Sequence, residues 1–441
     1  MFRTFFQAVC LSILLTGVSL AEDAKSLPNT EEDSVPAVTL PLPQLSIGSA
    51  ITLEAAIERA LTESPRLKSF GFARAATSGR RSQAGALPNP EFGIDAENFS
   101  GQGAYRGLDS AEVTYGVSQL LEIGGKRDAR KEIAFQGYRV ASREYDAARL
   151  DLIRDVTIAY AEAVAAKEAL TLAEKQKALA GEVLDSVTER VNAAAEPLFQ
   201  RSKSVVAYTS SEMALDKARR DNTIARNRLA ATWGAEELDG DVDSVGFFQI
   251  SAPAPMPGIE ELKRNPDFAK WEAEVSRSKA TFELEQANAI PDPSLSLGVR
   301  DFRESGDWAL MAGVSIPLPV FNLNGGNIET ARQEVSKTES DKDSASIGIM
   351  AELTRSSEEL ENAYRRAVSL KETVIPAAEK AFSLSRFGYR AGKFPYLEVL
   401  DAQRTLVETR IQYNESLRDY HVKRAEVERL TGKHFAQINQ E

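Results

Sequence analysis

The sequence is poor in the residues on which most catalytic and metal sites depend. Among its 441 residues there is one cysteine, Cys10, and there are two histidines, His421 and His434. Because Cys10 lies in a segment that we expect to be removed on export, the mature chain would have no thiol. This excludes a disulfide scaffold, thiolate zinc sites and cysteine nucleophiles. The two histidines form no cluster, and His421 is expected to be an ordinary helix residue. We therefore predict that the protein is not an enzyme and has neither a cofactor nor a resident metal.

Basic residues are too few for a nucleic-acid-binding protein. The chain has 53 Lys and Arg residues against 65 Asp and Glu residues, a formal net charge of −12, and it has no clustered basic run. Neutralising a phosphate backbone needs such clusters, so we exclude nucleic acid as a partner. A nucleotide-binding loop is missing too, because Gly124-Gly125-Lys126 lacks the upstream glycine and the following serine or threonine.

No apolar run is long enough for a membrane-spanning helix, and the run near the N-terminus is typical of an export signal. Residues 1–21 have Arg3 at the positive end, then an apolar stretch and small residues, which indicates a secretory signal peptide. Lipid attachment at Cys10 is the alternative, although Val9 is not the small residue expected just before a lipidated cysteine. Residues 22–47 are acidic and contain several prolines, which indicates an extended leader.

The chain contains an internal duplication with a period of roughly 200 residues. The segment LPNPEFGID at 87–95 recurs as IPDPSLSLG at 290–298. Likewise, YGVSQLLEIGGKR at 115–127 recurs as AGVSIPLPVFNLNGGN at 312–327, which keeps the two glycine pairs in step. Because the matching segments occur in the same order, we predict two tandem repeats. The predicted first repeat, second repeat and C-terminal tail are 48–240, 255–432 and 433–441.

Each repeat contains two short segments in which apolar and polar residues alternate. The predicted strands lie at about 91–99, 111–121, 294–302 and 308–318. In the first of them, Phe92 and Ile94 alternate with Glu91 and Asp95. Such alternation fits either a half-buried soluble sheet or a barrel whose outer face meets lipid. The pattern alone leaves both interpretations open.

Each repeat also contains a very long predicted helix. Between Arg127 and Val191 there is no proline, and apolar residues, many of them alanine, recur at alternating spacings of four and three. Such heptads indicate coiled-coil packing, and at 1.5 Å per residue a helix of this length reaches roughly 100 Å. The matching helix of the second repeat lies at about 327–391, and Pro376 within it is expected to bend it.

The predicted strands are too few to form a pore in one chain. The smallest membrane barrels have about eight strands, whereas this chain has four. An exported chain with such strands and such long helices therefore needs partners. Three copies would supply twelve strands, which is enough to enclose a pore.

These features resemble the outer membrane efflux protein family, the TolC-like channel-tunnels, over about residues 50–432. NPEFGIDAENF (89–99) and VSQLLEIGGKRDAR (117–130) are similar to the CzcC-like branch that serves heavy-metal efflux pumps. PLPVFNLNGGNIETA (317–331) resembles the matching stretch of the second repeat in that branch. The resemblance implies an α+β membrane protein that forms a homotrimer. Each protomer would contribute four transmembrane β-strands to a twelve-stranded barrel in the outer membrane of a Gram-negative bacterium, and coiled-coil helices to a tunnel in the periplasm.

The function implied by this resemblance is a passive exit duct. The protein would be the outer-membrane channel of a tripartite efflux system, embedded in outer-membrane lipid and joined to a periplasmic membrane-fusion adaptor and an inner-membrane RND-type pump. The expected substrates are divalent heavy-metal cations such as cobalt, zinc and cadmium. Multidrug efflux or type I protein secretion is an alternative use of the same duct. A periplasmic coiled-coil structural or adaptor protein is the non-channel alternative, although adaptors usually carry a lipoyl-like β-domain.

The resemblance also assigns the two turns at which the periplasmic helix pairs reverse, VNAAAEPLF (191–199) and RAGKFPYLEVLDAQ (390–403). In relatives the second turn contains glycine and is followed by carboxylates that ring the entrance. Glu398 and Asp401 match those carboxylates and are the predicted periplasmic gate. Their alternative role is that of solvated acids near a helix N-terminus. The predicted adaptor contacts are Val191, Asn192, Ala193, Arg390 and Gly392, with Asn192 standing where glycine is common.

The polar faces of the predicted strands carry five charged residues. These barrel-lumen candidates are Glu91, Asp95, Glu97, Glu112 and Arg300. If they point inward, four acids against one base make the lumen acidic, and rings of carboxylates favour cations. Opening is expected to come from splaying of the inner helix pair at the tip when the adaptor and pump bind.

Overall fold

The computed structural model describes residues 50–432 apart from 257, 259–261 and 263–264. The predicted signal peptide, acidic leader and C-terminal tail lie outside the described residues, as do Cys10 and His434. The strands, the long helices and both turns between helix pairs lie within them. The described part of the chain therefore contains all the residues that were proposed from sequence for the lumen, the gate and the adaptor contacts.

The strands form one antiparallel sheet in the order β1-β2-β3-β4. Their bounds are Glu91–Glu97 for β1, Glu112–Leu120 for β2, Ser294–Phe302 for β3 and Asp307–Ser315 for β4. Each of the four segments expected from the alternating pattern corresponds to one of these strands. Because β2 and β3 come from different halves of the chain, the middle of the sheet joins these halves, and β1 and β4 form its outer edges.

The strand register sorts the side chains onto two faces, because successive residues of a strand point to opposite sides. The apolar face carries Phe92, Ile94, Val113, Tyr115, Val117, Leu295, Leu297, Val299, Leu310 and Val314. The opposite, polar face carries Glu91, Asp95, Glu97, Glu112, Thr114, Ser118, Ser296 and Arg300. The apolar face is open in this chain, with Leu310 76% and Leu297 69% exposed. A contiguous exposed apolar surface marks a site of contact with protein or membrane.

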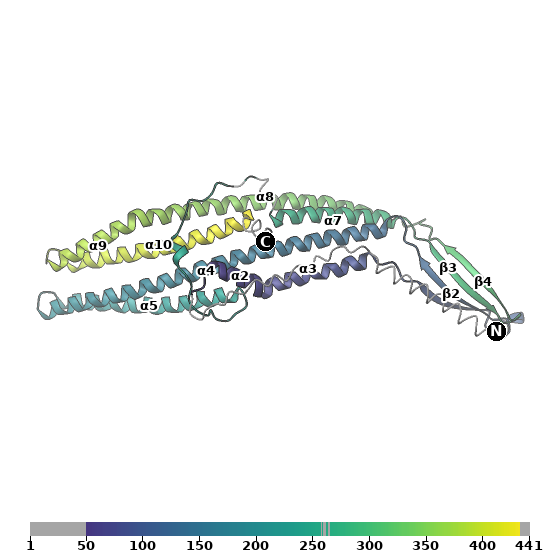
Figure 1. Cartoon of the computed structure of the whole chain (residues 1–441), viewed down its shortest axis with the longest axis horizontal. Coiled ribbons are helices and arrows are strands. Elements are labelled where there is room, and N and C mark those ends of the chain that lie inside the picture. Colours follow the sequence, from purple (N-terminus) through teal and green to yellow (C-terminus); the bar gives the residue numbers. More distant parts are fainter. Residues whose placement is uncertain (1–49, 257, 259–261, 263–264, 433–441) are drawn as a thin grey trace. The chain divides into compact units, whose positions relative to one another are not determined.

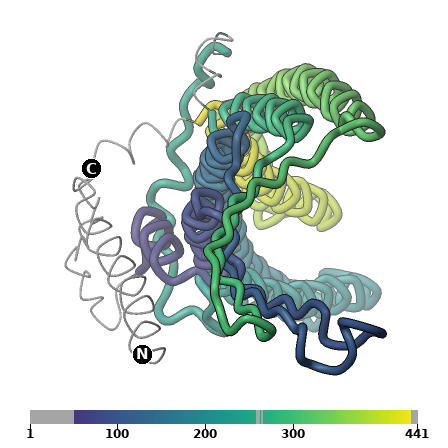
Figure 2. The backbone as a smooth tube through the Cα atoms, turned by 90° about the vertical axis from the view of Figure 1, so that its right-hand side faces the viewer, coloured from purple at the N-terminus to yellow at the C-terminus, as the bar shows by residue number. Residues whose placement is uncertain are grey.

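Long helices make up most of the rest of the described chain (Figure 1). The first half contains α2 (Leu53–Glu63), α3 (Pro65–Ala84), α4 (Lys126–Asn192) and α5 (Leu198–Ala231), and α4 alone has 67 residues. The second half contains α7 (Pro266–Asn288), α8 (Gly325–Ser369), α9 (Ile375–Arg390) and α10 (Tyr396–Thr431). Figures 1 and 2 show α10 between α8 and α4, with α5 on the other side of α4.

The second long helix is interrupted, whereas the sequence predicted one helix at about 327–391. α8 ends at Ser369, residues Leu370–Val374 (η3) form a π-helical turn, and α9 begins at Ile375. Pro376 lies in the first turn of α9. Because proline has no N–H and its ring crowds the preceding turn, the regular hydrogen-bond pattern is lost there. The wider turn accommodates the proline inside an otherwise helical segment.

The main hydrophobic core lies where α2, α4 and α5 meet. Ala56 and Ala60 of α2, Val156 and Ala163 of α4 and Leu229 of α5 are all fully buried. Small alanine side chains at several of these positions allow the helices to pack closely. His421 of α10 is also packed, with Nε2 2.8 Å from the carbonyl oxygen of Phe247. Burial lowers the pKa of this imidazole.

Two polar side chains tie the end of α10 to α7 and α4. Asn265 is 1% exposed, and its amide nitrogen donates to the carbonyls of Arg429 and Leu430 at 3.2 and 2.7 Å. Its amide oxygen accepts from the N–H of Asp267 at 2.8 Å and thereby caps α7. The guanidinium of Arg429 pairs with Asp151 of α4 at 2.8 Å and with Asp267 of α7. Three helices are therefore joined through one arginine.

Candidate functional site

The two turns between helix pairs lie at the same end of the helices (Figure 1). Residues 193–197 join α4 to α5, and residues 391–395 join α9 to α10. The predicted adaptor contacts lie at the ends of α4 and α9 and at the start of these turns: Val191, Asn192, Ala193, Arg390 and Gly392. Gly392 has a φ of 71°, in the left-handed region that glycine adopts without strain. Its N–H donates to the Tyr389 carbonyl at 2.9 Å and ends α9.

In the first turn the left-handed residue is Ala194, with a φ of 56°. Asn192 is still the last residue of α4. Ala194 stands three positions before Pro197, and Gly392 stands three positions before Pro395; each proline directly precedes a helix. The assignment of Asn192 to the glycine position is therefore wrong, because the counterpart of Gly392 is Ala194.

A buried cluster, here called the tip cluster, joins the two turns inside one chain. It consists of Val187, Tyr389, Tyr396 and Val399, each 5% exposed or less. The rings of Tyr389 and Tyr396 lie 5.8 Å apart. The hydroxyl of Ser204 on α5 donates to the Tyr396 hydroxyl at 3.0 Å. Apolar packing and one buried hydrogen bond therefore hold the α9–α10 tip against the α4–α5 tip.

Arg190, near the end of α4, contacts this cluster from its edge. Its guanidinium lies 4.6 Å from the centroid of the Tyr389 ring and 3.5 Å from a carboxylate oxygen of Glu196. One guanidinium nitrogen also lies 3.5 Å from the Tyr389 carbonyl oxygen. Sequence reasoning did not select Arg190 or Tyr389, because nothing local relates residues that are 199 positions apart. The only signal was their place beside the two predicted turns.

The predicted gate carboxylates are exposed in the first two turns of α10. Glu398 and Asp401 are three positions apart, which places them on one side of the helix. Within the described chain neither forms an ion pair or side-chain hydrogen bond. The N-terminal end of a helix favours negatively charged side chains. Both acids are therefore favoured at this position without any ion-pair partner. The structure places both acids beside the tip cluster, with Val399 of that cluster between them in sequence.

The structure brings three of the five lumen candidates into one group on the polar face of the sheet. The guanidinium of Arg300 on β3 lies 3.1 Å from Glu97 of β1 and 3.0 Å from Glu112 of β2. Arg300 Nε also donates to the Thr114 hydroxyl at 2.9 Å. Glu97 and Glu112 are directly opposite in the register, so the arginine relieves the repulsion between them.

Glu91 and Asp95 do not join this group. Both lie on β1 with exposed side chains, and neither has an ion-pair partner within the described chain. Asp95 is opposite Thr114 and Glu91 is opposite Ser118. Near one end of β1 the polar face therefore has two carboxylates whose charge Arg300 offsets in part. Along the rest of that strand it has two carboxylates without an ion-pair partner.

Replacing Arg300 with alanine is expected to increase cation preference in the reconstituted channel. The change removes one positive charge per copy and leaves Glu97 and Glu112 uncompensated. A unit charge about 4 Å from an ion is worth about 1 kcal/mol in water, or roughly fivefold in relative permeability. Reversal potentials in a salt gradient measure this ratio. Arg300→Lys keeps the charge and should behave as wild type; an unchanged ratio in Arg300→Ala would show that this face does not meet the permeating ions.

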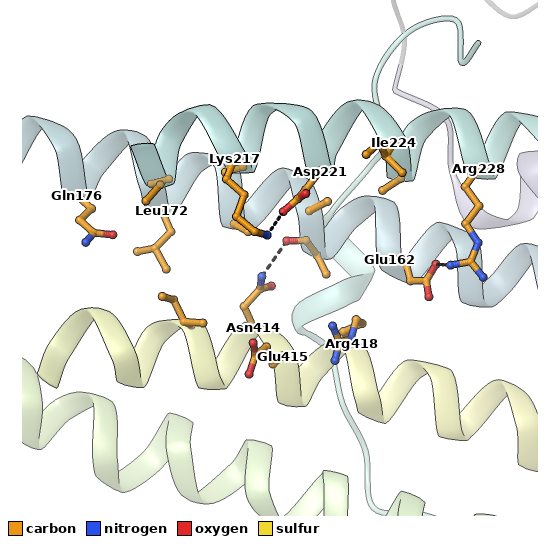
Figure 3. A pocket seen from close by; sticks show the side chains of 18 residues that line it. Glu162, Leu172, Gln176, Lys217, Asp221, Ile224, Arg228, Asn414, Glu415 and Arg418 are labelled. Carbon is orange, nitrogen blue, oxygen red and sulfur yellow. Dashed lines mark hydrogen bonds and ion pairs between the residues drawn. The ribbon is translucent and has the colours of Figure 1, made fainter. Parts of the chain in front are cut away.

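A groove of about 530 Å³ lies between α4, α5 and α10 (Figure 3). Four of its charged side chains pair with one another: Lys217 pairs with Asp221 at 2.5 Å, and Arg228 pairs with Glu162 at 2.6 Å. The amide of Asn414 donates to the Ala165 carbonyl at 2.8 Å. Within the described residues, no group of three or more His, Cys, Asp and Glu side chains could hold a metal ion. The groove is therefore a space between packed coiled-coil helices.

Two segments of the chain, residues 56–235 and 259–433, match the family described as outer membrane efflux protein. The chain belongs to this family. The two matched segments fall on the two predicted repeats. The family is one of efflux channels rather than of enzymes, and the predicted outer-membrane location is confirmed.

Relatives with known roles point to the heavy-metal branch of the family. The cobalt-zinc-cadmium resistance protein CzcC of Cupriavidus metallidurans is 30% identical over 388 residues, covering 87% of this chain and 90% of the relative. The nickel-cobalt-cadmium resistance protein NccC of Alcaligenes xylosoxydans xylosoxydans is 28% identical, covering 71% of this chain and 72% of the relative. The resemblance to CzcC-like proteins that the sequence motifs indicated is therefore confirmed.

Solved structures show the same protomer fold. The channel CusC superposes with a TM-score of 0.75 at 17% identity, covering 88% of this chain and 93% of that one. The outer membrane protein VceC of Vibrio cholerae gives 0.70 at 20% identity, covering 86% and 96%. The protomer thus has the TolC-like fold. Among the helices in the described part of the chain, none combines the length and apolar character needed to span a bilayer.

Proposed function

We propose that three copies of this protein form a twelve-stranded barrel in the outer membrane, continued by a helical tunnel in the periplasm. The observation that carries this proposal is the sheet, which has one apolar face, one polar face and two free edges. Lipid would cover the exposed apolar face, and pairing between copies would satisfy the backbone groups at the edges. Family membership and the TolC-like protomer fold support the same assembly.

The duct serves a tripartite efflux system in this proposal. An inner-membrane RND-type pump supplies the energy, a periplasmic adaptor binds the helix tips, and this protein provides the passive exit. The resistance systems named for CzcC and NccC support divalent cobalt, zinc, cadmium or nickel as the cargo. The unpaired Glu91 and Asp95 on the polar face would favour cations over anions if that face lines the pore.

The tip is the proposed gate. Glu398 and Asp401 of three copies would ring the entrance with six carboxylates, and the tip cluster with Arg190 would hold the entrance closed. Adaptor contact at Val191, Ala193 and Arg390 would separate the α9–α10 tip from the α4–α5 tip. Two packed arrangements of the same helices, rather than a flexible loop, would then define the closed and open states.

A growth panel tests the proposed cargo. We expect a strain lacking this gene to be more sensitive than the complemented strain to cobalt, zinc, cadmium or nickel, and equally resistant to dyes and detergents. Sensitivity to dyes and detergents alone would contradict the metal assignment and favour the multidrug alternative. The panel should be run in a background without other channels of the same family, so that no second duct can replace the deleted one.

A further inference from the structure

The connection between the two halves of the chain is held at two places. After α5 the chain passes through η2 (Val245–Phe248) before α7 begins; residues 243–251 of this connection are here called the connecting segment. At its start, the N–H of Asp243 donates to the Ile51 carbonyl at 3.0 Å. The Tyr160 hydroxyl of α4 donates to the Asp243 carbonyl at 2.7 Å. This first anchor fixes the segment to the first half of the chain.

Two consecutive residues of α10 form the second anchor. The Tyr420 hydroxyl accepts from the N–H of Ser251 at 3.2 Å and donates to the carbonyl of the same residue at 2.9 Å. His421 holds Phe247, because its Nε2 lies 2.8 Å from the Phe247 carbonyl oxygen and the two rings stack with centroids 5.2 Å apart. Phe247 is 5% exposed and belongs to the main core, together with residues of α4 and α5. The connecting segment therefore ties α10 to the first half of the chain.

The hydrogen bond to Phe247 fixes which nitrogen of His421 can take up a proton. A carbonyl oxygen only accepts, so Nε2 carries the hydrogen of the neutral ring and Nδ1 is the nitrogen left to be protonated. Nδ1 has no hydrogen-bond partner among the described residues. No carboxylate therefore stabilises a charged ring at that nitrogen.

The surroundings of His421 disfavour the protonated ring on balance. Burial is the largest influence and, together with the positive charge of Arg424, lowers the pKa of this imidazole, although the Phe247 carbonyl and Glu428 favour the charged form. Arg424 and Glu428 belong to α10 and pair with each other at 3.0 Å. Residues 244–256, which include the facing Phe247, contain no charged side chain. Among the described residues of α4 and α8, no charged group acts on the ring.

The lowered pKa sets the direction in which acid acts on the second anchor. Above about pH 6.5, the ordinary value for histidine, the ring is neutral in both the held and the released segment, so the anchor has its full stability. Below that pH the released form takes up the proton more readily than the held form. Linkage then favours release, by at most about tenfold per pH unit, until the pH reaches the lowered pKa. Acid therefore weakens the second anchor.

We infer that His421 is a pH-sensitive anchor, which holds the connecting segment on α10 when its ring is neutral and releases the segment when the ring is protonated. The first anchor does not respond in this range, because burial raises the pKa of Tyr160 above its usual value. Acid thus frees residues 245–251 from α10 and leaves Asp243 in place. This switch lies in the middle of the helices and depends neither on the trimer nor on the cargo.

Hydrogen–deuterium exchange of the full-length protein in detergent tests the inference. Exchange is followed by mass spectrometry at pH 7.5 and pH 5.5 and corrected for the intrinsic effect of pH. Most carboxylates stay ionised at pH 5.5. Protection of peptides covering residues 245–251 should fall several-fold at pH 5.5, and at most about tenfold for one proton. The N–H of Asp243, bonded to Ile51 in the first anchor, should keep its protection.

His421→Gln is the matched control. Its amide nitrogen can still donate to the Phe247 carbonyl, but the side chain cannot become cationic. Protection of residues 245–251 should therefore be the same at both pH values in this variant. His434 remains in it, so any difference from the wild type is due to His421. An equal loss of protection in acid in the two proteins would overturn the inference, as would unchanged protection in the wild type.

Release of the connecting segment is also expected to ease opening of the tip, an effect that rests on the proposed gate. The segment is one of the contacts that hold α10 to the first half of the chain, and separating the tips moves α10. Single-channel recording should show an open fraction several-fold higher at pH 5.5 than at pH 7.5 in the wild type, and no such rise in His421→Gln. Exchange that responds to acid while the open fraction does not would overturn this effect on the gate and support the anchor alone.

Discussion

Replacing Arg190 with alanine is expected to raise the resting conductance of the closed channel by roughly 5- to 30-fold. In this structure, which we propose to be the closed arrangement of the tip, the guanidinium contacts the Tyr389 ring, the Tyr389 carbonyl and Glu196. A cation–π contact and a partly exposed ion pair together contribute about 1–2 kcal/mol. If they exist only in the closed arrangement, losing them shifts the closed–open equilibrium by that factor. Single-channel recording from purified protein in planar bilayers measures the open fraction directly.

A matched control for this variant is Arg404→Ala. Arg404 is also near the tip, but it pairs with Glu408 on its own helix at 2.7 Å and is 79% exposed. Its loss should leave the open fraction unchanged, because no contact between the two tips depends on it. An equal open fraction in the two variants, whether raised in both or unchanged in both, would contradict the role given to Arg190.

Replacing Arg429 with alanine is expected to cause a large loss of stability, about 3 kcal/mol. Its guanidinium is 10% exposed and bridges Asp151 of α4 and Asp267 of α7. Removing one partner of a buried ion pair costs about 3–5 kcal/mol. We expect the lower end because the two carboxylates are 24% and 29% exposed and regain some hydration. Thermal unfolding followed by circular dichroism at fixed protein concentration provides the measurement.

The control for Arg429 is Arg418→Ala on the same helix. Arg418 pairs with the adjacent Asp419, and both side chains are 42% exposed; exposed pairs of this kind contribute about 0–1 kcal/mol. The unfolding temperature of Arg429→Lys should lie between those of wild type and Arg429→Ala. An ammonium keeps the charge but lacks the planar guanidinium that reaches two carboxylates. Unfolding of Arg429→Ala at the same temperature as Arg418→Ala would contradict the expectation.

Much of the protomer could be predicted from local sequence patterns. Alternation of Phe92 and Ile94 with Glu91 and Asp95 indicated a strand with two different faces, and the observed register places these residues as the alternation required. The absence of proline between Arg127 and Val191 indicated one long helix, and α4 spans that whole interval. In each case the signal lies within the segment that it describes, so no knowledge of the tertiary structure was needed.

Contacts between distant segments could not be predicted in the same way. Arg300 was assigned to the polar face, but its pairing with Glu97 and Glu112 depends on the register of three strands. Arg190 and Tyr389 meet only because two helix tips pack together. The left-handed residue of the first turn was misplaced for a different reason, since alanine at position 194 gives no sign of the conformation it adopts.

Pro376 shows an intermediate case. Its presence indicated a disturbance in the second long helix, but not the form that the disturbance takes. The structure has the π-helical turn Leu370–Val374, which ends two positions before this proline. Either a kink or a wider turn relieves the same steric conflict, and the packing of the neighbouring helices decides between them.

Metal retention in living cells is the most direct test of the central claim that this protein is the exit duct for divalent cations. Cells lacking the gene and complemented cells are loaded with cobalt or zinc and diluted into metal-free medium, and cell-associated metal is followed over time. The account predicts slow loss without the gene and fast loss with it. Equal rates of loss in the two strains, with the pump and adaptor present and no second channel of the family, would contradict it.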